Sequence, residues 1–295
     1  MLRFAHKDFA ASTLKHVMAS RSSSTLLSFS HLNQFSTSST LNYTEKNQKA
    51  QQPKSFLSKL FFGGKNSKDE KFKKLIYSRN VCLHELIVHK VKPGYLDEYV
   101  KQIPEIYSIY EKKYGAIVKP TGCFTTLIGS LDSVVHILEY PDYPSIEKLI
   151  EAKQTDPDLT TKLNTLLKLT YFTENQLMQE MSFCPTSPPT VTNGVYEFRS
   201  YTLKPGSYIQ WLEKWQAGLQ FRSNLPRLKG AWYSKNGTLN QVHHIWAYES
   251  MAERRKFRRA DWDSKGWSDS VRFTMPLIDV MHSCILKPLP FSPLR

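Results

Sequence analysis

The sequence predicts an α+β fold built from two tandem copies of one module, with two antiparallel sheets packed face to face and the helices outside. The first observation is that residues 81–94, VCLHELIVHKVKPG, return as residues 194–206, GVYEFRSYTLKPG, with the Lys-Pro-Gly endings 112 positions apart. The second is that residues 122–140 and 230–248 align without a gap and share seven identities in nineteen positions. A repeat of about 110 residues is the size of a whole domain and too long for a solenoid unit, so the chain contains a duplicated domain.

The first module covers residues 80–184. Its first helix is predicted from apolar residues that recur every three or four positions, and Pro104 is expected to kink that helix. Gly129 is typical of the turn between two hairpin strands. In chain order we expect a strand at 81–91, a helix at 95–114, strands at 122–128 and 134–140, a helix after Pro144 to Lys153, a helix at 158–171 and a strand at 175–183.

A Pro-rich linker, residues 185–193, ends the first module, and the second module covers residues 194–295. The second module repeats the order of the first. We expect a strand at 195–203, a helix at 207–222, strands at 230–235 and 241–248, helices at 251–265 and 268–277, and a strand at 282–289.

Each module therefore has the order strand, helix, strand, strand, helix, strand, with one extra helix. Such split βαβ units form a four-stranded antiparallel sheet with its helices on one face. The other face of the sheet must also be buried, and the second copy of the same sheet is the obvious cover. We therefore predict that the two modules pack sheet against sheet into a barrel-like core.

Residues 1–44 have the composition of a mitochondrial transit peptide. They are rich in Ser and Thr, carry Arg3, Lys7, Lys15 and Arg21, and contain the single acid Asp8. A mitochondrial import signal requires an amphipathic segment that is poor in acidic residues, as this one is. The alternative is a disordered Ser-rich tail that carries no targeting signal.

Residues 45–79 form a basic linker that contains a short amphipathic segment, SFLSKLFFGG at 55–64. Four apolar side chains of this segment, Leu57, Leu60, Phe61 and Phe62, form a small cluster that could contact a membrane surface peripherally. A plain linker is the alternative. The sequence contains no apolar run of about eighteen residues, so it predicts no transmembrane helix.

The formal charge of +14 is concentrated in the N-terminal segments. Residues 1–79 hold fourteen Lys or Arg and four Asp or Glu, which leaves a net charge of only +4 for residues 80–295. A nucleic-acid groove needs its excess charge on the folded surface, so we predict no nucleic-acid binding. The four cysteines are widely spaced without a zinc pattern and are expected to be reduced, and no metal or other cofactor is predicted.

The second module resembles the NipSnap family, and the resemblance extends with less similarity over the first module. Residues 55–61, SFLSKLF, are similar to the segment that precedes the family's first domain. The blocks that carry the resemblance are GVYEFRSYTLKPG at 194–206, VHHIWAY at 242–248, Gly266-Trp267, Met275-Pro276-Leu277 and FSPLR at 291–295.

This resemblance implies two tandem ferredoxin-like modules in the dimeric α+β barrel arrangement. It implies a matrix-targeted mitochondrial scaffold protein with no established catalytic activity. Some vertebrate members of the family are linked to mitophagy, are displayed on the outer surface when import fails, and are bound by autophagy adaptors and ubiquitin-like autophagy modifiers. These protein partners are expectations from the resemblance alone, and the oligomeric state is left open, with a homo-oligomer as one alternative.

His136 and His244 occupy equivalent positions in the two modules, and strand alternation places Trp246 on the same face as His244. Two imidazoles that converge in the cavity between the sheets would form a site for a ligand or a haem iron. The alternative, which we favour, is that each is a half-buried structural histidine, because metal ligation needs further ligands and none is evident.

Glu197 and Arg199 also share one strand face, and Glu85 is the equivalent of Glu197 in the first module. A buried Glu and Arg pair could anchor a polar ligand, but an internal ion pair is the more common arrangement. No Ser-His-Asp or Cys-His arrangement, Gly-rich phosphate loop or HExxH motif is present in the sequence, and no catalytic residue is predicted.

Phe72 and Leu75 lie three positions apart after the acids Asp69 and Glu70 in the basic linker. Ubiquitin-like modifiers bind such aromatic and aliphatic pairs by edge-strand addition, although short motifs also match by chance. We therefore predict a non-enzymatic mitochondrial scaffold or adaptor. The alternative is a small-ligand binder or oxidoreductase-type enzyme that uses the cavity between the two sheets.

Overall fold

Eight antiparallel strands close into one barrel in the computed structural model, which describes residues 82–295. The strand order around the barrel is β1-β3-β2-β8-β5-β7-β6-β4, so the four strands of each module are neighbours. The strands are β1 (Leu83–Val91), β2 (Lys119–Ile128), β3 (Ser133–Tyr140), β4 (Thr170–Glu180), β5 (Val195–Leu203), β6 (Leu228–Asn236), β7 (Gln241–Tyr248) and β8 (Ile278–Pro288).

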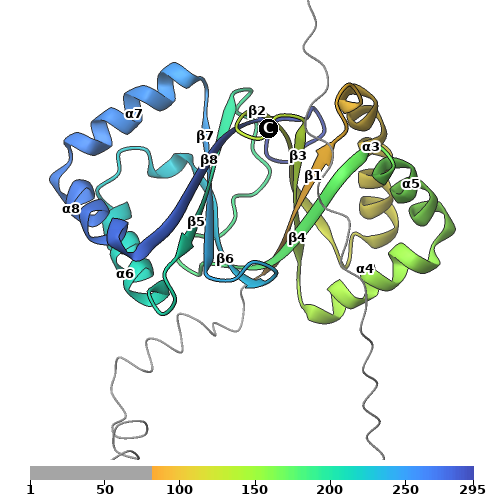
Figure 1. Ribbon diagram of the computed structural model, residues 1–295, viewed down its shortest axis with the longest axis horizontal. Helices are drawn as coiled ribbons and strands as arrows, with labels where there is room; N and C mark the ends of the chain where they lie inside the picture. The colour runs from red at the N-terminus through yellow and green to blue at the C-terminus, as the bar shows by residue number, and fades with distance from the viewer. Residues whose placement is uncertain (1–81) are drawn as a thin grey trace, which may run out of the picture. The chain divides into compact units, whose positions relative to one another are not determined.

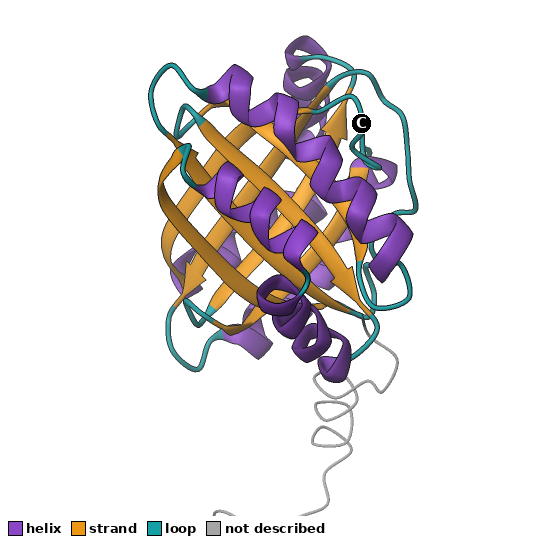
Figure 2. Cartoon of the chain, turned by 90° about the vertical axis from the view of Figure 1, so that its right-hand side faces the viewer, coloured by secondary structure: helices purple, strands orange, loops and turns teal. Residues whose placement is uncertain are grey.

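The helices of each module lie outside its own strands. Figure 1 shows one group of helices on each side of the strands, and Figure 2 shows helices lying across the outer face of the sheet. The predicted fold class is therefore confirmed. The first module contributes α3 (Leu96–Tyr114), α4 (Tyr143–Thr155) and α5 (Pro157–Leu167), and the second contributes α6 (Tyr208–Leu219), α7 (Met251–Asp263) and α8 (Lys265–Thr274), with 3₁₀ turns η1 (Leu225–Arg227) and η2 (Met275–Leu277).

The two modules are joined by hydrogen bonds between their edge strands. β2 of the first module pairs with β8 of the second, where Phe124 lies opposite Pro288. β4 pairs with β6 in the same antiparallel manner, where Leu177 lies opposite Asn236. An unpaired strand edge exposes a row of backbone N–H and C=O groups, and these two pairings remove the free edges of both sheets.

The barrel interior is a packed core to which both modules contribute. Alternate residues along each strand point inward, because successive side chains of a strand project to opposite faces. These side chains exclude solvent from the space between the two sheets. The buried inward cluster consists of Leu86, Phe124, Val135, Ile137, Met178, Tyr196, Phe198, Trp232, Ile245, Ala247, Leu286 and Leu294.

Two of the identities between the modules, Gly122 and Gly230, lie beneath aromatic rings in this core. A Cβ at Gly122 would lie 2.4 Å from the ring of Phe124, and a Cβ at Gly230 would lie 2.4 Å from the ring of Trp232. Each aromatic side chain therefore covers the glycine two residues before it on the same strand. The repeated glycine permits this close approach, since any larger residue would displace a core ring.

The repeated Lys-Pro-Gly sequence forms the same connection in both modules. Gly94 and Gly206 have φ values of +85° and +83°, a conformation that glycine adopts without steric cost, immediately before α3 and α6. The Lys92 ammonium donates to the Lys168 carbonyl at 2.6 Å, and the Lys204 ammonium donates to the Pro276 carbonyl at 2.7 Å. Each lysine thus ties the start of the module's first helix to the chain that enters its last strand.

Several predicted element boundaries differ from the structure. The helix predicted at 158–171 ends at Leu167, β4 begins at Thr170 rather than at residue 175, and β8 begins at Ile278 rather than at residue 282. The first half of β4 is solvent-exposed and so lacks the alternation of buried and polar residues that identifies a strand. α3 continues through Pro104 without interruption.

Candidate functional site

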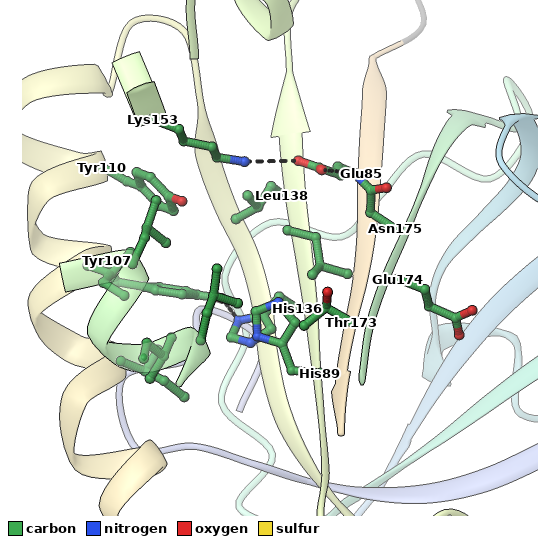
Figure 3. Close-up of a pocket in the computed structure, with 16 residues that line it drawn as sticks. Glu85, His89, Tyr107, Tyr110, His136, Leu138, Lys153, Thr173, Glu174 and Asn175 are labelled. Atoms are coloured by element: carbon green, nitrogen blue, oxygen red, sulfur yellow. Dashed lines mark hydrogen bonds and ion pairs between the residues drawn. The ribbon is translucent and has the colours of Figure 1, made fainter. Parts of the chain in front are cut away.

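Each module contains a cavity between its sheet and its helices. We call the cavity of the first module the first cavity; it has a volume of about 320 Å³ and is bounded by β1, β3 and β4 on one side and by α3, α4 and α5 on the other. Figure 3 shows its polar side chains. The residues that line it include Glu85, His89, Tyr107, Tyr110, His136, Lys153 and Asn175.

His136 is held on both sides of its ring. The Tyr99 hydroxyl lies 3.0 Å from Nε2 and the Tyr107 hydroxyl lies 3.0 Å from Nδ1, and both tyrosines project from α3. Burial lowers the pKa of His136 well below the ordinary value of 6.5, with the neighbouring His89 adding to the effect. The imidazole is therefore neutral, and both of its nitrogens already have partners. Figure 3 shows Tyr107 beside His136.

Glu85 lies across the same cavity and is also fully engaged. Its carboxylate accepts hydrogen bonds from the Tyr140 hydroxyl at 2.6 Å and from the Asn175 amide at 2.6 Å. The Lys153 ammonium lies 3.9 Å away, as the dashed line in Figure 3 shows. Two neutral donors and one cation thus hold a carboxylate that is 8% exposed.

The cavity of the second module, which we call the second cavity, has a volume of about 290 Å³. It is bounded by β5, β7 and β8 and by α6, α7 and α8, so it occupies the equivalent position beneath the helices. Its walls combine cationic and aromatic side chains. The lining residues are Arg199, Tyr201, Trp211, Trp215, Arg222, His244, Arg258, Asp261, Trp262, Trp267, Val271, Thr274, Met275, Ile278 and Met281.

His244 is fixed by aromatic neighbours. The Trp246 indole donates its N–H to His244 Nδ1 at 2.6 Å, the Trp215 ring stacks on the imidazole at 5.2 Å, and Tyr201 meets it edge-on at 5.2 Å. Burial lowers the pKa of His244 well below 6.5, and the positive charges of Arg199 and Arg222 lower it further.

Glu197 lies beside the second cavity and is surrounded by arginines. Its carboxylate accepts hydrogen bonds from Arg199 at 2.6 Å and from Arg254 at 2.7 and 2.9 Å, and Arg258 lies 3.6 Å away. Burial alone would raise the pKa of Glu197, but the Arg254 hydrogen bonds and the three positive charges outweigh it and lower the pKa to about 2. The carboxylate is therefore ionised at neutral pH.

A second buried ion pair completes the cavity wall. Arg222 donates to Asp261 at 2.9 and 3.1 Å, and its guanidinium lies between the Trp246 ring at 3.8 Å and the Trp267 ring at 4.5 Å. Sequence reasoning missed this pair. One signal was available for its helical member. Arg254, Arg258 and Asp261 fall at positions i, i+4 and i+7 on one face of α7, and this spacing predicts that the three side chains point toward the same neighbouring residues.

The structure does not bring the two predicted histidines together. His136 and Glu85 line the first cavity, whereas His244 and Arg199 line the second, and both histidines point toward helices rather than into the barrel interior. Glu197 and Trp246 contact residues of the second cavity. Among residues 82–295, no group of three or more His, Cys, Asp or Glu side chains is arranged to hold a metal ion. Phe72 and Leu75 lie outside the described residues.

No helix within residues 82–295 is both long enough and apolar enough to cross a membrane. The predicted transit peptide at 1–44 and the basic linker at 45–79 lie outside the described residues.

Both modules match the same protein family, and known proteins are similar to this chain over most of its length. The NIPSNAP family model matches residues 84–185 and again residues 196–293. Protein NipSnap homolog 2 of Homo sapiens is 33% identical over 215 residues, which cover 72% of this chain and 75% of the human protein. Protein NipSnap homolog 1 of Danio rerio is 32% identical over 214 residues, which cover 72% of this chain and 77% of the zebrafish protein.

Solved structures share the arrangement of strands and helices. The crystal structure of an anthrone oxidase-like protein matches with a TM-score of 0.54 at 11% identity, covering 73% of this chain and 95% of that protein. At this identity the likeness establishes the fold alone.

Proposed function

Because this chain belongs to the NipSnap family, we propose that it is a non-enzymatic mitochondrial scaffold or adaptor protein that acts through contacts with other proteins. Fold and family do not by themselves assign an activity, so support must come from the groups at the site. The observation that carries the proposal is that His136 and Glu85, the reactive side chains at the centre of the first cavity, are already held by internal contacts.

The first cavity illustrates this commitment. A general base needs a free nitrogen or oxygen within hydrogen-bond reach of its substrate. Both nitrogens of His136 are bound by tyrosine hydroxyls, and the Glu85 carboxylate is held by Tyr140, Asn175 and Lys153. Burial raises the pKa of the neighbouring Cys123 thiol to about 12, so it is not a thiolate nucleophile at neutral pH.

The mitochondrial part of the proposal rests on residues 1–44. We expect these residues to direct a fluorescent reporter to the matrix. Replacing Arg3, Lys7, Lys15 and Arg21 by Gln should abolish import, because the signal requires a basic amphipathic helix. A reporter whose location is unchanged by the four replacements would contradict this assignment.

The proposed link to mitophagy rests on the Phe72 and Leu75 pair. We propose that, when import fails, this pair binds a ubiquitin-like autophagy modifier by edge-strand addition, with autophagy adaptors as further partners. The double variant Phe72→Ala/Leu75→Ala should lose capture of the modifier from depolarised mitochondria. The matched control Phe61→Ala/Phe62→Ala removes two aromatic residues from the same linker and should retain capture.

Proximity labelling of the full chain in healthy and in depolarised mitochondria tests the proposal as a whole. We expect a reproducible set of labelled proteins that changes on depolarisation. The absence of any stable partner, together with turnover of a small molecule by the purified protein, would contradict it.

A second candidate function is small-ligand binding, and the cavities beneath the helices favour it. The cavity predicted between the two sheets is instead filled by the inward cluster of the barrel. Any ligand or oxidoreductase-type substrate would therefore occupy the first or the second cavity, whose volumes lie near the lower end of the range for small-molecule sites.

A further inference from the structure

The two modules differ at one position that decides whether the central histidine is satisfied. The offset that aligns the two Lys-Pro-Gly sequences places Tyr99 of α3 on Trp211 of α6. In the first module the Tyr99 hydroxyl lies 3.0 Å from His136 Nε2. In the second module an indole takes the place of the phenol, so no hydroxyl from this position reaches His244.

The proton on His244 can be placed from its hydrogen bonds. An indole N–H donates and cannot accept, so the bond from Trp246 requires that His244 Nδ1 accept. Burial keeps the imidazole neutral, and a neutral ring that accepts at Nδ1 carries its proton at Nε2. His244 therefore presents an Nε2–H donor, and the residue lines the second cavity.

This donor has no acceptor, and neither has a second donor in the same cavity. His244 Nε2 and Trp211 Nε1 are both buried, and neither has a hydrogen-bond partner among residues 82–295. The two rings are linked through Trp215, which stacks on Trp211 at 5.1 Å and on His244 at 5.2 Å. Buried polar groups in proteins are almost always hydrogen-bonded, so two orphan N–H groups in one cavity point to a missing acceptor.

The charges around the second cavity specify an anionic acceptor. Four guanidinium groups, those of Arg199, Arg222, Arg254 and Arg258, face only two carboxylates, those of Glu197 and Asp261, which leaves an excess of two positive charges. Three of these arginines line the cavity itself. Arginine and N–H donors together are suited to a carboxylate, which accepts hydrogen bonds through both of its oxygens.

The remaining walls specify the body of the ligand. Val271, Ile278 and the Trp267 ring form apolar surface within the cavity. Trp262 and Met275, which also line it, are about half exposed, and we place the entrance beside them. A volume of about 290 Å³ suits a small molecule with an aromatic or short aliphatic body.

We propose that the second cavity binds a small organic carboxylate, whose oxygens accept the His244 Nε2–H and Trp211 Nε1–H donors while its apolar body packs among the tryptophans. The first cavity lacks these features, because Tyr99 and Tyr107 already satisfy its histidine. The duplicated modules have thus diverged into one cavity whose histidine is satisfied by tyrosines and one whose histidine retains an N–H donor without a partner.

Binding of defined probes to the purified full chain tests the proposal. The probes are butanoate, phenylacetate and indole-3-acetate, each compared with its neutral amide, by titration calorimetry and by quenching of tryptophan fluorescence. We expect at least one carboxylate to bind saturably and at least about tenfold more tightly than its amide, because charge-assisted hydrogen bonds are roughly twice as strong as neutral ones.

Two variants locate the site. Trp211→Tyr introduces the phenol of the first module, whose hydroxyl can satisfy His244 Nε2, and should weaken carboxylate binding about tenfold while the protein remains folded. Arg258→Gln removes a positive charge from a partly exposed position in the cavity wall and should weaken binding without affecting the fold. The control Tyr110→Phe alters a tyrosine in the wall of the first cavity without freeing His136 and should leave binding unchanged.

Three results would overturn the proposal. The first is that none of the three carboxylates binds saturably at millimolar concentration, as expected if water alone satisfies the two N–H groups. The second is equal affinity for acid and amide, or binding that neither Trp211→Tyr nor Arg258→Gln weakens. The third is tighter binding of phenyl phosphate than of phenylacetate, which would assign the cavity to a phosphate instead.

Discussion

Neutralising Glu197 should destabilise the protein much more than neutralising its counterpart Glu85. Glu197 is fully buried and receives hydrogen bonds from Arg199 and Arg254, with Arg258 close by. Its pKa falls from an ordinary value of 4.5 to about 2. At 1.36 kcal/mol per pKa unit, this shift corresponds to about 3 kcal/mol of stability, in the range found when one partner of a buried ion pair is removed.

The pH dependence of this contribution follows from the direction of the shift. A carboxyl group with a depressed folded-state pKa stabilises the protein in full above about pH 4.5, and the contribution is lost as pH falls through about 2. Glu197→Gln should therefore lower the free energy of unfolding by about 3 kcal/mol at pH 7. The difference from the natural protein should shrink as the pH is lowered from 4.5 toward 3.

Urea denaturation at several pH values measures both effects, and Glu85→Gln is the matched control. Glu85 is held mainly by two neutral donors, so this substitution should cost only about 1 kcal/mol. Equal losses for the two variants, or a Glu197→Gln loss that does not change with pH, would refute the electrostatic account of the arginine cluster.

Three further predictions concern the core. Trp232→Ala should lower the free energy of unfolding by about 3 to 5 kcal/mol, whereas Trp262→Ala at a half-exposed position should cost about 1 kcal/mol or less, both measured by urea denaturation. Gly230→Ala should cost about 1 to 3 kcal/mol in the same assay, because its Cβ would displace the Trp232 ring. Cys123, fully buried with a pKa of about 12, should react with a thiol reagent more slowly than the partly exposed Cys82, as mass spectrometry of the labelled peptides would show.

The duplication made most of the fold predictable from sequence. The aligned Lys-Pro-Gly sequences and the aligned segments 122–140 and 230–248 established the equivalence of the modules, and the need to cover two bare sheet faces led to a barrel. The starts of β4 and β8 were missed because these strand segments are exposed on the outer surface and carry no alternating pattern. Local sequence does not determine which edge strands pair. The hydrogen-bonded junctions of β2 with β8 and of β4 with β6 were therefore known only from the structure.

The candidate site was predictable only in part. Alternation correctly placed His244 and Trp246 on one strand face, and it placed Glu197 with Arg199. It did not indicate which of the two faces is the barrel interior, so convergence of the two histidines between the sheets stayed open as the less favoured alternative. Arg222 and Asp261 were missed because they come from a loop and a helix that meet only in the folded chain. The free donor of His244 depends on the identity of residue 211. The sequence alone does not show that residue 211 on α6 packs near His244 on β7, so this donor could not be predicted.

Coincidence of unfolding transitions tests most directly the claim that the twin modules close one barrel around a shared core. All six tryptophans lie between Trp211 and Trp267, so tryptophan fluorescence reports the second module, while far-ultraviolet circular dichroism reports both. The shared core predicts a single denaturant midpoint by both probes. Two separate midpoints would show that each module folds on its own and would contradict the claim.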